Sequence, residues 1–258
     1  SFLNLDLEHR YEGTRIGTDL FAAARRYLRK KGMLENAGRY YQNSCRWMKQ
    51  VIKYAIEQAR RCDKITGYDM LGAIDCHWHR SGYAVGLMNE FYELKAGMTQ
   101  EEILRFNGES VLLADCGTRR NIWSGETLTL PVYVSLYGRD DWRDAKLSWK
   151  LMDEQNRVYA GGERQAGYAA AGGVSRLGTL ELSMPQLAVP MHLILQARLS
   201  GETYELENKW DFWCFPKEEE GQYSEEENSS CTNEVKIRKQ LEPADLLFME
   251  EGGRILLM

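Results

Sequence analysis

Alternating apolar and polar residues in the second half of the chain limit its fold more than any other feature. In residues 128–136 every second side chain is a leucine or a valine, and Thr129, Tyr133 and Ser135 lie between them. This two-residue period is that of a β-strand with one buried face. We expect further strands at the shorter runs 147–151, 180–184, 193–199, 204–206 and 210–215.

Turn-forming residues separate these runs, at 138–141, 153–156, 161–162 and 200–201. About seven short strands with such turns between them are typical of an immunoglobulin-like β-sandwich, often with a tryptophan in its core. Trp149, on an early strand, is the residue that we expect between the two sheets. No cysteine pair matches the antibody disulfide, so we predict a sandwich over residues 110–216 that lacks this bridge.

The first 109 residues show helical spacing instead. Thr18 is followed by an acidic first turn, which predicts a helix over 18–31. A longer helix is expected over about 33–62, from the spacing of its apolar residues. The capping box at 99–102 predicts a short helix to about residue 106.

A segment with unusual side chains lies between these helices. Residues 68–74 have the composition of a short buried strand, and an apolar helical run follows over 83–95. Polar and aromatic groups at the carboxyl end of a strand, before a helix, are where α/β barrels have their active sites. The candidate site residues at this strand end are Asp75, His77, Trp78 and His79.

The last part of the chain changes composition twice. Residues 217–233 contain two runs of glutamate among Gly, Ser and Asn, which predicts an acidic linker without a core. In 234–258 we expect a strand over 235–241, a helix over 243–251 and a buried strand over 254–258. This order is typical of the beginning of an α/β domain, and we expect that domain to be truncated here.

The bulk composition excludes several classes of protein. The net charge of −5 provides no basic surface for nucleic acid. No apolar run approaches the roughly 20 residues of a membrane span, and the N-terminus lacks a signal-peptide pattern and an initiator Met. The six cysteines form no C-x-x-C pair. We therefore expect reduced thiols, a cytoplasmic location and no cofactor.

The order of these features resembles glycoside hydrolase family 2, and most closely its β-galactosidase and β-glucuronidase-related branch. In that family, similar motifs surround the final barrel strand, close the sandwich and start an extra domain. The matching segments here are 32–37, 67–71, 85–91, 208–216 and 246–257. The resemblance implies that residues 1–109 are the C-terminal part of an (α/β)₈ TIM barrel, which precedes the sandwich.

The resemblance also implies a retaining glycosidase that acts on β-linked glycosides, with two catalytic glutamates about 5–5.5 Å apart. It places both on barrel strands before Ser1, so no catalytic residue is assigned to this chain, and we expect the 258 residues alone to be inactive. Asp75, His77, Trp78 and His79 would contact the carbohydrate substrate. In the family an apolar or Gly/Pro-rich loop usually follows this Asp. Here the residues that follow Asp75 are a cysteine, a histidine, a tryptophan and a histidine, at 76–79.

Other readings of the same residues stay open. Asp75 is equally compatible with capping a loop, and Trp78 with ordinary packing. Asp75, His77 and His79 could bind a metal, which would make the protein a metal-dependent hydrolase. A third possibility is a carbohydrate-binding or scaffolding module without chemistry.

The residues near the start of the chain are candidates of a lesser kind. The resemblance places Glu8 and Glu12 in a loop after the nucleophile strand, so neither is assigned a catalytic role. His9, Arg10 and Tyr11 lie in the same loop and could border the substrate cleft. Strands 68–74 and 254–258 would lack neighbours in this chain, so we expect them to mediate pairing into a homo-oligomer.

Overall fold

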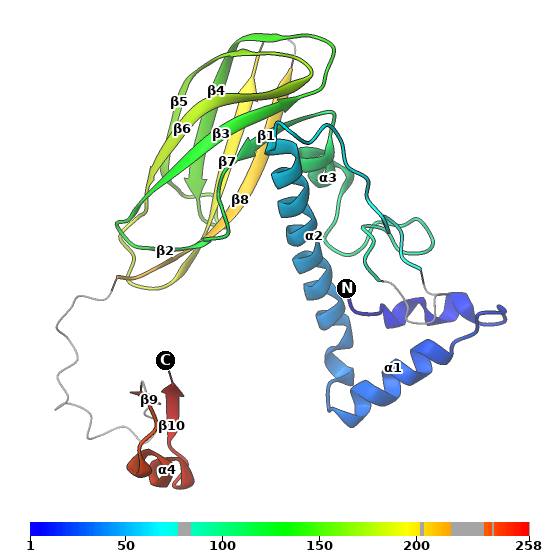
Figure 1. Ribbon diagram of the computed structural model, residues 1–258. Coiled ribbons are helices and arrows are strands. Elements are labelled where there is room, and N and C mark those ends of the chain that lie inside the picture. Colours follow the sequence, from blue (N-terminus) through cyan, green and yellow to red (C-terminus); the bar gives the residue numbers. More distant parts are fainter. Residues whose placement is uncertain (77–83, 202–203, 218–234, 239, 258) are drawn as a thin grey trace. The chain divides into compact units, whose positions relative to one another are not determined.

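A computed structural model describes residues 1–76, 84–201, 204–217, 235–238 and 240–257, and it divides the chain into two units. Ser1–Pro216 contains a helical segment followed by two stacked β-sheets, and Lys217–Met258 contains a strand, a helix and a second strand (Figure 1). None of the helices in the described segments combines the length and the apolar character that a membrane span requires.

The helical segment confirms the helices predicted at 18–31, 33–62 and 99–106, with small shifts at their ends. Its elements are η1 (Leu5–Tyr11), α1 (Asp19–Lys30), η2 (Leu34–Asn36), α2 (Ala37–Arg61) and α3 (Gln100–Asn107). The predicted capping box begins α3, since the Thr99 hydroxyl accepts from the amide of Glu102 at 3.2 Å. Gly32, with a φ of +65°, ends the first helix in a left-handed conformation.

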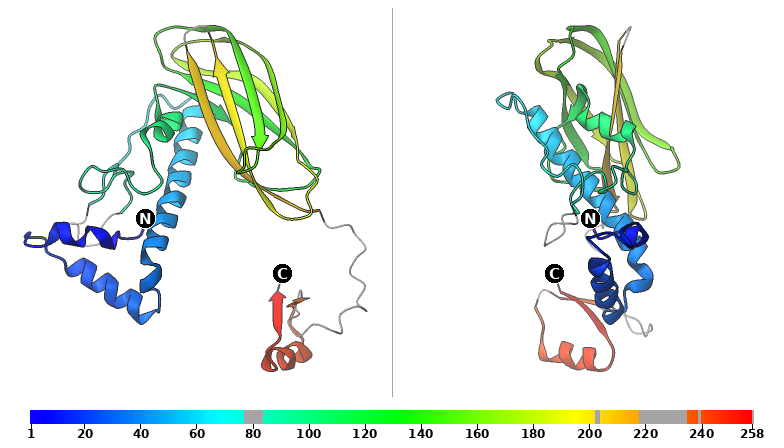
Figure 2. Two further views of the ribbon diagram at one scale, coloured as in Figure 1. Left: turned by 180° about the vertical axis from the view of Figure 1, so that it is seen from behind. Right: turned by 90° about the vertical axis from the view of Figure 1, so that its right-hand side faces the viewer.

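The long helix α2 runs from the core of η1 and α1 to the sandwich, and a third small core lies along it. Near its N-terminal half, Phe21 of α1 packs with Leu5 and Tyr11 of η1. At 25 residues and about 1.5 Å per residue, α2 extends roughly 37 Å to reach the sheets (Figure 2). There Arg60 donates to the carbonyls of Gly108 at 2.7 Å and Glu109 at 2.8 Å, which fixes the end of α2 at the start of the sandwich.

The predicted strand 68–74 and helix 83–95 are wrong for the residues that the structure describes. In their place Ile74 forms a parallel bridge with Met88, and Met88 an antiparallel bridge with Leu94. The cause is close backbone contact at Gly86, where a Cβ atom would lie 2.7 Å from the Ala73 carbonyl oxygen. The apolar residues of this stretch therefore serve a folded loop.

The expected TIM barrel is likewise not shown. Within the described part of residues 1–109, the chain forms helices and isolated bridges, and no strand of a barrel. A barrel strand needs a hydrogen-bonded neighbour on each side. The short bridges at Ile74 and Met88 do not extend into such a ladder.

The β-sandwich consists of one three-stranded and one five-stranded sheet. The first has the order β1 (Ser110–Ala114), β3 (Thr127–Leu136) and β6 (Gly173–Ser183). The second has the order β2 (Asn121–Trp123), β8 (Glu205–Phe215), β7 (Met191–Ser200), β4 (Trp142–Met152) and β5 (Val158–Ala169). Only the β2–β8 pair of these sheets is parallel.

The alternating residues that predicted the strands form the core between the sheets. Leu130, Val132, Val134 and Leu136 of β3 are buried, and so is every second residue of β7 from Leu193 to Leu199. Burying one leucine or valine side chain contributes about 1.5–3 kcal/mol to folding. The predicted strands at 128–136, 147–151, 180–184 and 193–199 are confirmed, and those at 204–206 and 210–215 are parts of one strand, β8.

The predicted turn at Gly161–Gly162 is wrong, whereas Trp149 packs against the core of the sandwich as expected. These glycines lie inside β5, and Gly162 faces Trp149 across the sheet. A Cβ atom on Gly162 would come within 2.7 Å of the Trp149 ring, so the missing side chain makes room for the indole. Trp149 is half-buried and packs against the core between the sheets. Strands β1, β2 and β5 were not predicted.

The second unit is small. It contains β9 (Val235–Arg238), α4 (Pro243–Glu250) and β10 (Arg254–Leu257), close to the predicted elements. The expectation that 254–258 lacks a partner is wrong over the described residues, because β10 pairs in parallel with β9. Arg238 contacts the carboxylate of Asp245 at 3.0 Å, which links β9 to α4. Apart from Lys217, the predicted acidic linker lies outside the described residues.

Candidate functional site

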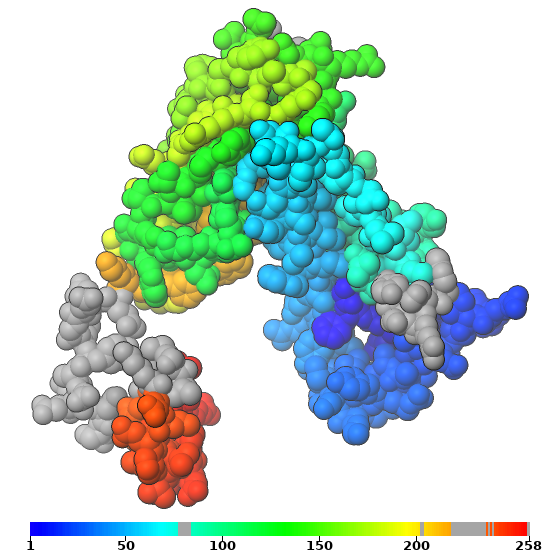
Figure 3. All heavy atoms as spheres, in the orientation of Figure 1, coloured from blue at the N-terminus to red at the C-terminus, as the bar shows by residue number. Residues whose placement is uncertain are grey.

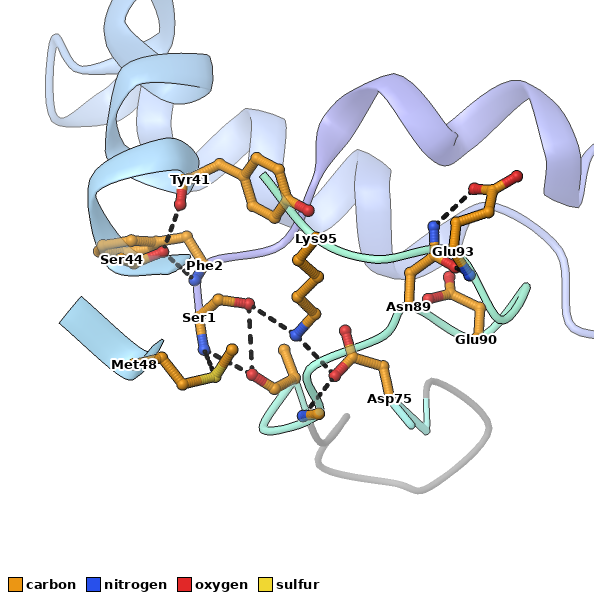
Figure 4. Close-up of polar contacts among 12 residues, drawn as sticks. Ser1, Phe2, Tyr41, Ser44, Met48, Asp75, Asn89, Glu90, Glu93 and Lys95 are labelled. Carbon is orange, nitrogen blue, oxygen red and sulfur yellow. Dashed lines mark hydrogen bonds and ion pairs between the residues drawn. The ribbon is translucent and has the colours of Figure 1, made fainter. Parts of the chain in front are cut away.

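Asp75 is buried and held by two donors. Asp75 is only 4% exposed. Its Oδ1 accepts a hydrogen bond from Lys95 Nζ at 2.7 Å and one from the backbone amide of Gly86 at 2.9 Å. Lys95 is 3% exposed and also donates to Ser1 Oγ at 3.0 Å (Figure 4). A buried charge is tolerated when it is paired and hydrogen-bonded, as both of these are.

The backbone around Asp75 explains how these groups meet. The amide of Asp75 donates to the Met88 carbonyl at 3.0 Å, and the amide of Lys95 donates to the Leu87 carbonyl at 3.1 Å. Three short extended pieces therefore lie side by side, with Met88 in the middle one. This arrangement brings two residues that are 20 positions apart into one ion pair.

A second polar cluster lies on the turn that follows. The Tyr11 hydroxyl donates to the Glu90 carboxylate, and Asn89 Nδ2 donates to Glu93 Oε2 at 2.8 Å. Arg10 pairs with Glu93 at 2.7 Å and lies over the Phe91 ring at 3.6 Å. Figure 4 shows Asn89, Glu90 and Glu93 on the part of the chain next to Asp75 and Lys95.

Charged groups of both clusters act on the hydroxyl of Tyr11. Burial raises the pKa of Tyr11 far above its usual value, and the Glu90 carboxylate and the charge of Asp75 add to this rise. Tyr11 is therefore a fixed hydrogen-bond donor at neutral pH. Because an ammonium and an amide already occupy Oδ1 of Asp75, this carboxylate is better suited to positioning a neighbour than to moving a proton.

The predicted site residues have different outcomes. Asp75 is the one that the structure describes, whereas His77, Trp78 and His79 lie outside the described residues. The metal hypothesis requires His77 and His79, so the structure does not describe two of its three ligands. Among the described residues, no group of His, Cys, Asp and Glu could hold a metal ion.

Of the candidate residues near the start of the chain, only some contact the region around Asp75. Glu8 pairs with Arg25 of α1 at 2.7 Å, and His9 Nδ1 lies 2.8 Å from the Asp6 carbonyl oxygen. Glu12 is exposed. Arg10 and Tyr11, in contrast, reach the turn after Met88, beside Asp75.

Sequence reasoning missed the roles of Lys95, Asn89 and Glu90. The predicted helix 83–95 assigned them to a helix surface, where charged residues need no partner. One signal was available, since Lys95 lies directly between the apolar residues Leu94 and Ala96. A lysine in such a position is buried only when a carboxylate compensates it.

Comparison with known proteins provides limited information. A family model described as a domain of unknown function (DUF8488) matches residues 126–216. No curated protein matches the sequence significantly.

The solved structures that match are distant. A family 123 glycoside hydrolase from Clostridium perfringens has a TM-score of 0.28 at 9% identity, over 38% of this chain and 22% of its own. A Parabacteroides merdae β-glucuronidase has a TM-score of 0.26 at 15% identity, over 34% and 11%. The DNA glycosylase AlkC of Pseudomonas fluorescens has a TM-score of 0.29 at 14% identity, over 42% and 30%.

This chain thus spans less than a third of each of these three proteins. The proteins act on different substrates, by their descriptions, and the TM-scores are low. The likeness therefore carries no function from any of them to this chain.

Proposed function

We propose that this chain is part of a retaining glycoside hydrolase related to family 2, and that Asp75 lies at the edge of its carbohydrate site. The observation that carries the proposal is the fixed, buried carboxylate of Asp75, which directly precedes the segment with His77, Trp78 and His79. The four residues would contact the sugar, with Asp75 as the anchor of the segment.

The order of domains supports the same proposal. The helical segment is followed by a β-sandwich with the sheet orders β1-β3-β6 and β2-β8-β7-β4-β5, and this supports the immunoglobulin-like assignment made from the sequence. Residues 1–109 would be the C-terminal part of a TIM barrel, an assignment that rests on the sequence resemblance.

The chemistry of retention defines the role that Asp75 can take. One carboxylate attacks the anomeric carbon while a second protonates the leaving oxygen, and the two lie about 5–5.5 Å apart. The resemblance assigns both to other barrel strands. Asp75, with Oδ1 already occupied, would orient a sugar hydroxyl or the neighbouring loop, and Tyr11 would remain a protonated donor beside it.

The test uses the whole protein that carries these residues and the nitrophenyl β-glycosides of galactose, glucuronic acid, glucose and mannose. We expect turnover of at least one glycoside, and a loss of about tenfold or more in kcat/KM with Asp75→Asn, the size of one charged hydrogen bond. Trp78→Ala should raise KM.

A folding defect must be separated from a lost sugar contact. Asp75→Asn leaves Lys95 buried without its counter-charge, so Asp75→Asn combined with Lys95→Met is the matched control. If stability returns in the double variant while activity stays low, Asp75 contributes to the site. Full activity in the double variant would make Asp75 purely structural, and glycan binding without turnover would favour a non-catalytic module.

A further inference from the structure

A groove lies between α2 and β8, lined by residues other than those around Asp75. Its volume is about 290 Å³, close to the lower end of the range for small-molecule sites. The lining residues that matter here are Trp47, Lys53, Glu57, Arg120, Trp210 and Trp213. In Figure 3 the blue surface of α2 meets the green and orange surface of the sandwich along this seam.

The floor of the groove holds a compensated ion pair. Glu57 of α2 is 5% exposed and accepts from Asn208 Nδ2 at 2.8 Å and from Trp210 Nε1 at 3.1 Å. Lys53 forms an ion pair with the same carboxylate, and burial lowers the pKa of its ammonium group. Both oxygens of Glu57 are therefore engaged, and this carboxylate is not available to another cation.

Arg120 is the charged group of the groove that lacks a carboxylate. Its guanidinium lies 5.4 Å from the centre of the Phe212 ring, and its Nη1 is buried without a hydrogen-bond partner among the described residues. The other acid of the groove, Asp211, already contacts Gln50 at 2.7 Å and His192 at 3.0 Å. A buried guanidinium nitrogen normally has an acceptor, and a carboxylate fits its planar donors best.

Two exposed tryptophans line the same groove as Arg120. Trp47 on α2 is 71% exposed and Trp213 on β8 is 43% exposed. Large aromatic rings that remain in water beside fixed polar groups are typical of binding surfaces. Such rings offer a flat apolar face to the C–H groups of a sugar.

We infer that the groove between α2 and β8 binds an acidic sugar, a single pyranose ring that carries a carboxylate. Arg120 recognises the carboxylate, and Trp47 and Trp213 flank the ring. The anionic character of the ligand follows from Arg120, whereas the choice of a sugar among small anions rests on the proposed function.

The experiment is a titration of the ¹⁵N-labelled whole protein with glucuronate, with glucose and benzoate as comparison ligands. The readout is the indole N–H signal of Trp47, assigned from the Trp47→Ala variant. We expect glucuronate to shift this signal and to bind at least tenfold more tightly than glucose or benzoate. Arg120→Gln should weaken glucuronate binding at least tenfold.

Matched controls separate the groove from the rest of the surface. Arg119→Gln changes the neighbouring arginine, which pairs with Glu126, and Trp123→Ala removes another exposed tryptophan. Neither residue lines the groove, so both variants should bind glucuronate normally. Asp75→Asn should likewise leave the Trp47 shift intact.

Several results would overturn the inference. An unchanged Trp47 signal, or equal glucuronate affinity in Arg120→Gln, would remove the site. Equal binding of benzoate and glucuronate would remove the sugar, and protection of Trp47 from acrylamide quenching in the free protein would show that another part of the protein covers the groove. Groove binding without turnover of any glycoside would contradict the proposed function alone.

Discussion

At the scale of single residues, two buried carboxylates define the polar interior of the helical segment and its junction with the sandwich. Asp75 is paired with Lys95, and Glu57 is paired with Lys53. Each pair has further donors from the backbone or from side chains, which offset the cost of removing charge from water. Removing one partner of such a buried pair therefore lowers the free energy of unfolding by more than the intact pair contributes to it.

This asymmetry gives a first prediction. Lys95→Met should destabilise the protein by about 3–5 kcal/mol, because it leaves the Asp75 carboxylate buried without its cation. Adding Asp75→Asn should restore most of that loss. Urea unfolding of the single and double variants measures both values, and equal stabilities for the two would contradict the pairing.

A second prediction concerns the thiol of Cys116, which is buried beside Lys53, Glu57 and Arg120. Burial raises the pKa of Cys116 to about 11, although the nearby Arg120 opposes the rise. We expect this thiol to react with Ellman's reagent far more slowly than the partly exposed Cys62 at pH 8. Equal rates for the two thiols in the folded protein would show that Cys116 is accessible and ionised.

At the scale of elements, the glycines of β5 and the turn before it shape the edge of the larger sheet. Gly162 leaves space for the Trp149 ring. Asp153, at the end of β4, accepts from the amides of Gln155 and Arg157, each at 2.9 Å, and from the Tyr159 hydroxyl at 3.0 Å. These contacts fix the β4–β5 hairpin, and its turn lies where the sequence predicted it, at 153–156.

The third prediction tests the packing of Trp149. Gly162→Ala should cost about 1–3 kcal/mol, the usual effect of overfilling a packed site. Gly173→Ala is the matched control, because a Cβ atom there has open space around it. Thermal melts of both variants decide the matter, and a loss confined to Gly173→Ala would contradict the placement of the indole.

The fourth prediction is a pH dependence at Asp153. Burial alone would raise the pKa of Asp153, but hydrogen bonds from Arg157, Tyr159 and Gln155 hold it below its usual value. The carboxylate therefore contributes stability above the unfolded pKa of about 3.9, and that contribution disappears as the pH falls through the lower folded value. Asp153→Asn should flatten the acid limb of a stability-versus-pH curve and leave the alkaline limb unchanged.

At the scale of the whole molecule, α2 joins the helical segment to the sandwich in one unit, Ser1–Pro216. The contacts of Glu57 with Asn208 and Trp210, and of Arg60 with Gly108 and Glu109, cross that junction. The self-association that we expected through unpaired strands stays a prediction. Neither of its two reasons holds for the described residues, because 68–74 forms no strand and β10 has a partner in β9.

The fifth prediction follows from the junction. Glu57→Gln should increase hydrogen exchange in the C-terminal half of α2 and in β8 together, because Lys53 loses its counter-charge and the link to Trp210 weakens. Glu35→Gln, in the exposed η2 turn, is the control and should change neither segment. Faster exchange in α2 alone would mean that the two parts do not depend on this contact.

The sequence by itself determined five of the eight strands of the sandwich, β3, β4, β6, β7 and β8, and the helices α1, α2 and α3. Their signals are local, since alternation at 128–136 sets which face is buried and the capping box at Thr99 starts a helix within one turn. Such patterns act over a few residues and need no knowledge of the rest of the chain.

Only the tertiary structure decided the candidate sites. Asp75 and Lys95, Tyr11 and Glu90, and Glu57 and Trp210 meet because of how distant segments pack. The apolar residues from Val85 to Leu94 are compatible with a helix or with a folded loop, and the close backbone approach at Gly86 selects the loop. A contact between residues far apart in the chain depends on this packing, which no local period records.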